Sequence, residues 1–217
     1  NPRWGWFLME LPASLVFLFF FLSGDQRFEP VPLVLAAIWM IHYGNRGFLF
    51  PMLMRIHPGA KKTFNILVVS IGMLVTAIHG YLNGWYFSEL GSQYTADWLT
   101  DPRFVVGLVI YYIGFLLNLQ SDSILRNLRP KNGLGKGEDR YKIPHGGLFK
   151  FVTCPQYLTE LIAWTGFAIM TWSPGGLFIL GISAANLVPR AFETHRWYRE
   201  NFSDYPPERK ALIPGLV

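Results

Sequence analysis

Four polar side chains at helical spacing are the first feature of this 217-residue chain that could do chemistry. Asn118, Asp122, Arg126 and Arg129 follow one another at intervals of four, four and three residues, which aligns them on one side of a helix. They continue the apolar run RFVVGLVIYYIGFLL, which begins at Arg103. Ionisable groups within such a run are costly to bury and usually face a bundle interior or a water-filled cavity. The pattern therefore predicts a site for a polar ligand that reaches into a membrane from its basic side.

Polar residues interrupt other apolar runs in the same way. Glu10 is followed by Pro12, which opens the hydrogen-bond ladder of a helix and makes room beside the carboxylate. The segment HYGNR, which begins at His42, places Tyr43 and Arg46 in the middle of another run. Such a cluster is difficult to explain as a lipid-facing surface, so we expect these side chains to face the interior.

The C-terminal half of the chain adds a second set of polar side chains at helical spacing. Gln156 and Glu160 lie one turn apart, and Arg190, Thr194 and Tyr198 follow at intervals of four. Each set projects from one side of a helix, which is the arrangement needed to line a shared cavity.

Counting about 1.5 Å per residue along each predicted span estimates the depth of these groups. Glu10, Tyr43, Asn118, Glu160 and Arg190 all fall roughly 18 to 24 Å into a hydrocarbon core ~30 Å thick, so they form one layer. The acidic groups of this layer would tolerate burial by pairing with its arginines.

Two further groups fall outside this layer by the same count. His79 and Asn83 are expected near the outer surface, where they would form hydrogen bonds between helices.

The layer includes Arg46 and Asp122, and the expected pairing joins Glu10, Asp122 and Glu160 with Arg46 and Arg190. Removing Asp122 or Arg190 is therefore expected to weaken both folding and ligand binding.

The elements that must position these residues are membrane-spanning helices. The composition is 51% hydrophobic and only 15% charged, and the apolar residues form long runs. The sequence predicts an all-α, polytopic membrane bundle that forms a single domain over residues 1–217. A further helix before Asn1 would make seven in the full protein. The six predicted spans, each near the ~20 residues needed to cross a bilayer, are 6–23, 31–55, 64–86, 103–125, 156–173 and 175–199.

Charge and cysteine content exclude several classes of function. The net charge of +5 comes from Lys and Arg in alternate loops, so it indicates membrane orientation rather than nucleic-acid binding. This distribution places Asn1, the loop 126–154 and the C-terminus in the cytosol. Cys154 is the only cysteine, which excludes an intrachain disulfide and a cysteine-rich zinc site, and no metal site is expected. The glycine run NGLGKGED lacks a flanking strand, so a Rossmann dinucleotide site is not supported.

Several motifs together resemble the steroid 5α-reductase family (3-oxo-5α-steroid 4-dehydrogenases). They are ELP at Glu10, HY at His42, N-x-x-SD-x-x-LR-x-LR at Asn118 and YKIPHGGLF at Tyr141. The last is RAF-x-x-HR-x-Y, which begins at Arg190 and is followed by DYP-x-x-RKALIP. The resemblance covers nearly the whole chain, and the final run is highly specific. It implies a seven-helix membrane oxidoreductase that uses NADPH to reduce the C4–C5 double bond of a 3-oxo steroid.

The resemblance also implies roles for individual residues. Glu10 and Tyr43 would form the catalytic pair near the steroid 3-oxo group, where a donor must meet negative charge that develops on the oxygen. The residues that would bind NADPH are Asn118, Asp122, Arg129, Tyr141, Gln156, Glu160, Arg190, Thr194 and Tyr198.

The expected partners are a lipophilic steroid and the lipid bilayer, with no nucleic acid and no obligate protein partner. The NADPH site would face the cytosol, from an inner membrane if the protein is bacterial or from the endoplasmic reticulum if it is eukaryotic. Three alternatives remain: an enoyl-CoA or polyprenol reductase of the same superfamily, a membrane methyltransferase of the isoprenylcysteine or phospholipid type, and a non-enzymatic sterol-binding or transport protein.

Overall fold

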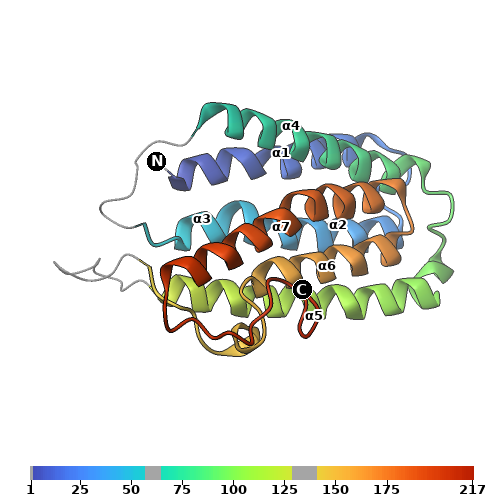
Figure 1. The fold of residues 1–217 in the computed structure, drawn as a ribbon. Coiled ribbons are helices and arrows are strands. Elements are labelled where there is room, and N and C mark those ends of the chain that lie inside the picture. Colours follow the sequence, from blue (N-terminus) through green and yellow to red (C-terminus); the bar gives the residue numbers. More distant parts are fainter. Residues whose placement is uncertain (1, 57–64, 129–140) are drawn as a thin grey trace.

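The protein is an all-α bundle in a computed structural model that describes residues 2–56, 65–128 and 141–217. Neighbouring long helices run side by side along one axis (Figure 1). Their bounds are α1 Pro2–Ser23, α2 Pro30–Tyr43, η1 Gly44–Leu49, α3 Phe50–Leu53, α4 Ile66–Trp85, η2 Tyr86–Leu90, η3 Ala96–Thr100, α5 Pro102–Asn127, η4 Gly147–Lys150, α6 Pro155–Thr171 and α7 Pro174–Asn201.

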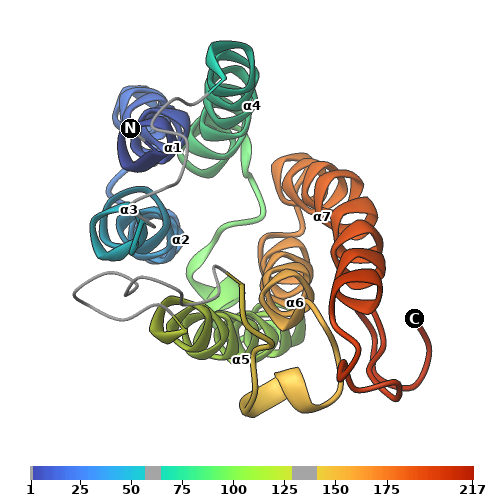
Figure 2. The same cartoon turned by 60° about the vertical axis from the view of Figure 1, so that its left-hand side comes forward.

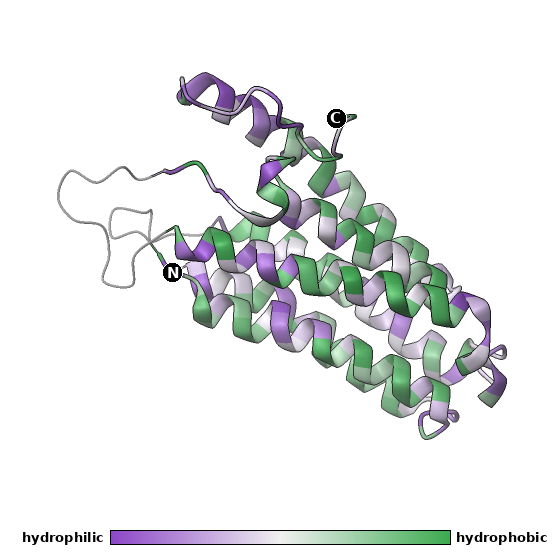
Figure 3. Cartoon of the chain, turned by 90° about the horizontal axis from the view of Figure 1, so that it is seen from below, coloured by the Kyte–Doolittle hydropathy of each residue, from purple (hydrophilic) through white to green (hydrophobic). Residues whose placement is uncertain are grey.

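The prediction of a helical membrane bundle is confirmed. Helices α1, α4 with η2, α5 and α7 are each long and apolar enough to cross a membrane. Helix α2 has 14 residues, but it continues through the π-helical segment η1 into α3, so this run covers most of the predicted span 31–55. Helix α6 has 17 residues and begins and ends within two residues of its predicted bounds. Hydrophobic residues follow the middle of the helices, and hydrophilic residues gather toward their ends (Figure 3).

Local sequence signals set the helix starts. Proline occupies the first turn of α2, α5, α6 and α7, where its missing N–H leaves no hydrogen bond unmade. The Asp101 side chain accepts a hydrogen bond from the Arg103 N–H, and the Ser173 hydroxyl accepts one from the Gly176 N–H. These caps are readable from sequence because they depend only on neighbouring residues.

Two pairs of helices pack most closely, α5 with α6 and α1 with α4 (Figure 2). Glycine permits the closest approach between α5 and α6: a Cβ atom at Gly114 would lie 2.4 Å from the Ala163 nitrogen, and one at Gly166 would lie 2.3 Å from the Tyr111 nitrogen. Small residues at such crossings let backbones pack directly in a bilayer. The two helices that carry Asp122 and Glu160 are therefore held at a defined separation.

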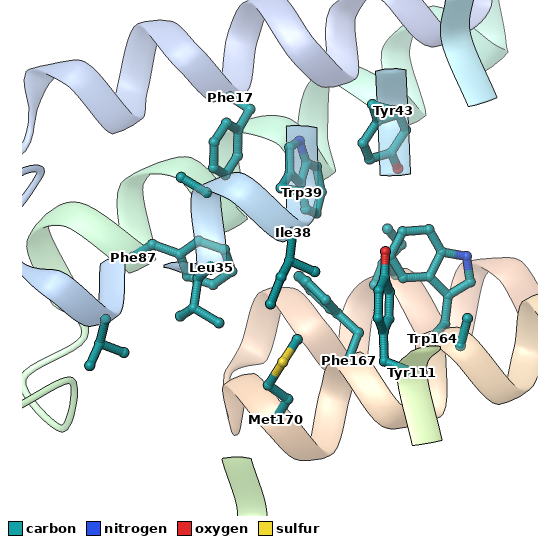
Figure 4. Packing of buried hydrophobic residues seen from close by; sticks show 14 of the residues in the cluster. Phe17, Leu35, Ile38, Trp39, Tyr43, Phe87, Tyr111, Trp164, Phe167 and Met170 are labelled. Carbon is teal, nitrogen blue, oxygen red and sulfur yellow. The ribbon is translucent and has the colours of Figure 1, made fainter. Parts of the chain in front are cut away.

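An aromatic core fills the bundle beside the polar layer (Figure 4). The Trp39 ring stacks on Phe17 of α1 at 5.0 Å and packs against Phe167 of α6 at 5.7 Å. Its Nε1–H donates to the Ala13 carbonyl at 2.9 Å, which satisfies the one polar atom of this buried ring. Helix α2 is thus fixed between α1 and α6, and Tyr43 follows one turn after Trp39.

Candidate functional site

A cavity of about 530 Å³ lies between the helices, within the 300–1,000 Å³ range of small-molecule sites. Polar and apolar side chains from α1, α2, η1, α3, α4, α5, α6 and α7 line it. The polar or ionisable members of the lining are Glu10, His42, Tyr43, Arg46, Thr76, His79, Asp122, Gln156, Tyr157, Glu160, Ser183, Asn186 and Arg190.

One guanidinium holds three carboxyl groups at this cavity. Arg46 lies 4.0 Å from Glu10, 3.8 Å from Asp122 and 3.3 Å from Glu160, and these four side chains are only 10 to 16% exposed. The carboxyl groups come from α1, α5 and α6, so the cluster joins three helices to η1. Buried charges persist only when they are paired. The predicted pairing of Glu10, Asp122 and Glu160 with Arg46 is therefore confirmed.

The π-helical segment η1 positions Arg46. π-Helical turns are rare and frequently occur at functional sites. A Cβ atom at Gly47 would lie 3.2 Å from the Glu10 Cβ, so glycine allows α1 to pass close to this turn. The sequence signal for Arg46 is a basic residue inside an apolar run, three residues after Tyr43, but its place at the centre of the cluster depends on four separate elements.

The Tyr43 hydroxyl lies 2.9 Å from the Nε2 atom of His79, and both residues are buried. His79 does form the expected hydrogen bond between helices. The prediction that His79 lies outside the polar layer is wrong, because His79 lines the cavity that also contains the Arg46 cluster. The helical run continues through η2 to Leu90, four residues beyond the predicted span 64–86. His79 therefore lies deeper from the outer end than the sequence count placed it.

Asn118 connects α5 to α6 instead of lining the cavity. Its Nδ2 group donates to the main-chain carbonyl of Gln156 at 2.7 Å and to the Thr159 hydroxyl at 3.3 Å. Gln156 itself lines the cavity, and its Oε1 atom is buried without a hydrogen-bond partner in the described part of the chain. An orphaned acceptor of this kind calls for a donor from outside the protein, such as a ligand N–H or a water.

The predicted residues on α7 divide between two places. Arg190 lines the cavity and is exposed, and within the described ranges it forms no ion pair. Tyr198 lies two turns further along, about 12 Å by helical rise, where its hydroxyl donates to the Lys142 carbonyl at 3.4 Å and its ring stacks on Tyr205. The expectation that Asn118 and Tyr198 help to line this cavity is therefore wrong.

The remaining predicted residues surround the polar end of α7 or fall outside the described ranges. The Thr194 side chain lies beside the Cys154 thiol, and the Tyr141 ring packs edge-on against Trp197 at 5.0 Å. Neither Thr194 nor Tyr141 lines the cavity. Arg129 and the glycine run after it lie outside the described residues.

The C-terminal motif RKALIP has a structural role beside these residues. Its backbone pairs with the segment before α6: Thr153 N–H donates to the Lys210 carbonyl at 2.8 Å, and Cys154 N–H donates to the Ala211 carbonyl at 3.2 Å. The Thr153 hydroxyl also lies 2.6 Å from His195 Nδ1 and 2.6 Å from the Tyr205 hydroxyl. Burial raises the pKa of the covered Cys154 thiol to about 12. The tail thus fixes Cys154, which precedes the first residue of α6 and lies two residues before Gln156.

Comparisons with known proteins agree over the length of the chain. A family model described as 3-oxo-5-alpha-steroid 4-dehydrogenase matches residues 62–217. The 3-oxo-5-alpha-steroid 4-dehydrogenase 1 of Rattus norvegicus is 39% identical, over 100% of this chain and 84% of its own. The same-named protein of Homo sapiens is 37% identical, over 99% and 80%. The steroid 5-alpha-reductase DET2 of Gossypium hirsutum is 36% identical, over 100% and 82%. Glu10 and Tyr43 precede the family-model match but lie inside all three alignments.

Proposed function

Because this chain belongs to the 3-oxo-5-alpha-steroid 4-dehydrogenase family of oxidoreductases, we propose that it reduces the C4–C5 double bond of a 3-oxo-Δ4 steroid with NADPH, giving a 5α-reduced 3-oxo steroid. The observation that carries the proposal is the cavity in which Tyr43 and Glu10 lie beside the Arg46 cluster. It brings a phenol donor, a carboxyl group and an apolar wall to one site inside a membrane bundle.

The two proposed catalytic residues act on the carbonyl end of the enone. Hydride addition at C5 moves negative charge onto the 3-oxo oxygen, and a donor positioned there lowers the barrier. The Tyr43 phenol would donate to that oxygen, and Glu10 on the neighbouring helix, protonated in this buried site, would donate a second hydrogen bond to it. Both groups are held by the fold before substrate arrives, so little reorganisation accompanies the reaction.

The residues present also fit a nicotinamide cofactor, which supplies the hydride when bound. The orphaned Gln156 Oε1 suits the N–H donors of a carboxamide. Three carboxyl groups face the single Arg46 guanidinium, and this surplus of acidic groups suits a ring that becomes positive as it gives up hydride. Arg190 is an exposed cation at the cavity and would bind a phosphate.

Asn118 would act from outside the cavity by fixing Gln156, because it donates a hydrogen bond to the main-chain carbonyl of Gln156. Tyr141, Thr194 and Tyr198 would bind the more distant part of the same cofactor, near the polar end of α7. Arg129 completes this proposed set by its position in the motif shared with the family. Arg and Lys near that end favour NADPH over NADH, because NADPH carries an additional phosphate.

The apolar part of the lining suits a steroid. Val68 and Ile71 of α4 and Ile182 of α7 line the cavity and are also 36 to 54% exposed. A lipophilic substrate would enter sideways from the bilayer between these two helices, so it need not pass through water. The partners of the chain would then be steroid, cofactor and lipid, with no nucleic acid and no obligate protein partner.

We place the cofactor side of this single domain, residues 1–217, toward the cytosol, because Lys and Arg concentrate in the loops and tail at that end. The membrane would be the inner membrane in a bacterium or the endoplasmic reticulum in a eukaryote.

The deciding experiment incubates purified protein with NADPH and, separately, 3-oxo-Δ4 steroids, a 2-enoyl-CoA and a polyprenol. The expected result is a product two mass units heavier than a steroid substrate, with matching loss of NADPH absorbance. Reduction of only the enoyl-CoA or the polyprenol would contradict the steroid assignment. Methyl transfer from S-adenosylmethionine, or recovery of every compound unchanged, would contradict the proposed reaction.

A further inference from the structure

We infer that His79 is a positioning residue for the proposed reaction: its Nε2–H donates to the Tyr43 oxygen and leaves the phenol proton free for the substrate carbonyl. This inference rests on the proposed function, in which Tyr43 is the proton donor. The Tyr43 hydroxyl lies 2.9 Å from His79 Nε2, and the two residues belong to different helices, α2 and α4. Tyr43 is 2% exposed and His79 is 5% exposed, so water does not compete freely for either group.

The second ring nitrogen decides the direction of this hydrogen bond. His79 Nδ1 is buried and has no hydrogen-bond partner in the described residues. If Nδ1 carried the proton, the protein would bury an N–H donor with no acceptor, which is rare in native structures. If Nε2 carries the proton, only the lone pair of Nδ1 is left unpartnered. Burying this unpaired acceptor costs less free energy than burying an unpaired N–H donor. A doubly protonated ring would bury both the orphan donor and a charge with no paired carboxylate among the described residues.

The direction determines whether Tyr43 is able to donate to substrate. A phenol has one proton, and a bond from Tyr43 to His79 would use it. With the proton on Nε2, the Tyr43 oxygen accepts from His79 and retains its own proton. The phenol O–H prefers the ring plane, where it has two orientations, and a donor on one side leaves the other for the proton. The histidine thus keeps the proton available to an acceptor in the cavity that both residues line.

Packing holds the imidazole in this position. The Trp39 ring meets the His79 ring edge to face at 5.7 Å, and Trp39 is itself fixed by its hydrogen bond to Ala13. The Asn83 side chain donates to the main-chain carbonyl of His79 at 2.9 Å within α4, so the expected hydrogen bond between helices is wrong for Asn83 in the described residues. The imidazole therefore contacts the Trp39 ring and, through Nε2, the Tyr43 hydroxyl, so its position is set by the fold.

The sharpest test reads the proton position directly. In protein labelled with ¹⁵N-histidine, the side-chain nitrogen shifts of His79, assigned by their loss in His79→Gln, should show a protonated Nε2 and an unprotonated Nδ1. This measurement uses the wild-type protein, so it remains decisive if a variant fails to fold. A proton on Nδ1 would overturn the inference while leaving the steroid reaction itself untouched.

Kinetics test the consequence for turnover. His79→Leu removes the donor and should lower kcat about tenfold, the order of one hydrogen bond, with little change in the steroid KM or in NADPH affinity. His79→Gln returns an N–H donor at similar reach and should recover part of the loss. In a Tyr43→Phe background, His79→Leu should cause no further loss of kcat, because no phenol proton remains to be oriented.

The outcomes separate the two proposals. A full additional loss in the Tyr43→Phe background would show that His79 acts by another route, and the inference would fail. Normal turnover in Tyr43→Phe would overturn this inference together with the catalytic role of Tyr43. Failure of the wild type to reduce any 3-oxo-Δ4 steroid would be seen before these variants are made, and it would count against the proposed function.

Discussion

The guanidinium of Arg46 lies 3.3 Å from the carboxylate of Glu160, and this contact joins η1 to α6 inside the bundle. The two residues are 114 positions apart in the sequence, so no local pattern pairs them. Arg46 also reaches the carboxyl groups of Glu10 and Asp122, which makes it a structural centre of the cavity as well as a part of its lining.

Removing the Arg46 charge should destabilise the fold. Arg46→Met keeps most of the side-chain volume but leaves three buried carboxyl groups without their counter-charge, which should lower the free energy of unfolding by about 3 to 5 kcal/mol. Thermal unfolding in detergent measures the effect. Arg196→Met, at an exposed position on α7, is the matched control and should shift Tm only slightly. Equal Tm values for the two variants would mean that the cluster contributes no stability.

Loss of either proposed catalytic group should lower turnover strongly. Glu10→Gln and Tyr43→Phe each remove a group that acts on the substrate carbonyl, so kcat should fall by about 10² to 10³ while NADPH still binds. Steady-state turnover and NADPH fluorescence titration measure the two effects. Tyr81→Phe is the control, because Tyr81 is 42% exposed on α4 and does not line the cavity. A variant with near-normal turnover would remove its residue from the catalytic pair.

Arg190 should affect cofactor affinity with little effect on stability. Its side chain is exposed and forms no ion pair in the described structure, so the sequence-based expectation of a folding defect is replaced by one of unchanged Tm. Arg190→Ala should weaken NADPH binding about 10- to 100-fold through loss of charge-assisted hydrogen bonds. Arg196→Ala on the same helix is the control.

The same titration, repeated with NADH and at two ionic strengths, tests the role of the additional phosphate. NADPH should bind more tightly than NADH at low salt, and the difference should narrow as salt screens the cationic side chains. Equal affinity for both cofactors at low salt would argue against phosphate recognition by these residues.

The glycine contacts between α5 and α6 should be essential for the geometry of the cavity. Gly114→Ala places a methyl group 2.4 Å from the Ala163 nitrogen and 2.7 Å from the Thr159 carbonyl, so the helices must separate. We expect a lower Tm and weaker cofactor binding, because Asp122 and Glu160 move apart. Gly181→Ala is the control: an added Cβ atom there would have no described neighbour within 4 Å, and alanine favours the helix. Similar Tm values for both variants would contradict close packing at Gly114.

Cys154 should report on the docking of the C-terminal tail. Its pKa of about 12 lies above the ordinary value, so at pH 8 the reactive thiolate is depleted about 10³-fold relative to an unperturbed thiol. Labelling by a maleimide should be slow in the native protein and fast in denaturant. Thr153→Val, which removes the hydroxyl that contacts His195 and Tyr205, should accelerate native labelling. Rapid labelling of the native wild type would mean that the tail leaves the thiol accessible.

Much of this protein is determined locally by its sequence. Apolar runs of membrane length, proline in first turns and the Asp101 and Ser173 caps specify the helices without reference to tertiary contacts. The cost of burying charge likewise indicates that Glu10, Asp122 and Arg46 belong inside the bundle, because only pairing or a ligand makes such burial tolerable. Counting residues along each predicted helix therefore places most of the polar residues that line the cavity at a similar depth in the membrane.

Tertiary structure decides which of these groups meet. Asn118 and Asp122 lie on the same side of α5, yet Asn118 binds α6 while Asp122 lines the cavity, because the close α5–α6 crossing covers only the former. The extension of α4 through η2 brings His79 to Tyr43, and the π-helical turn directs Arg46 toward three helices at once. Helix rotation, extension and separation are set by side chains distant in sequence, so a count along one helix reports depth but not the neighbour that a side chain meets.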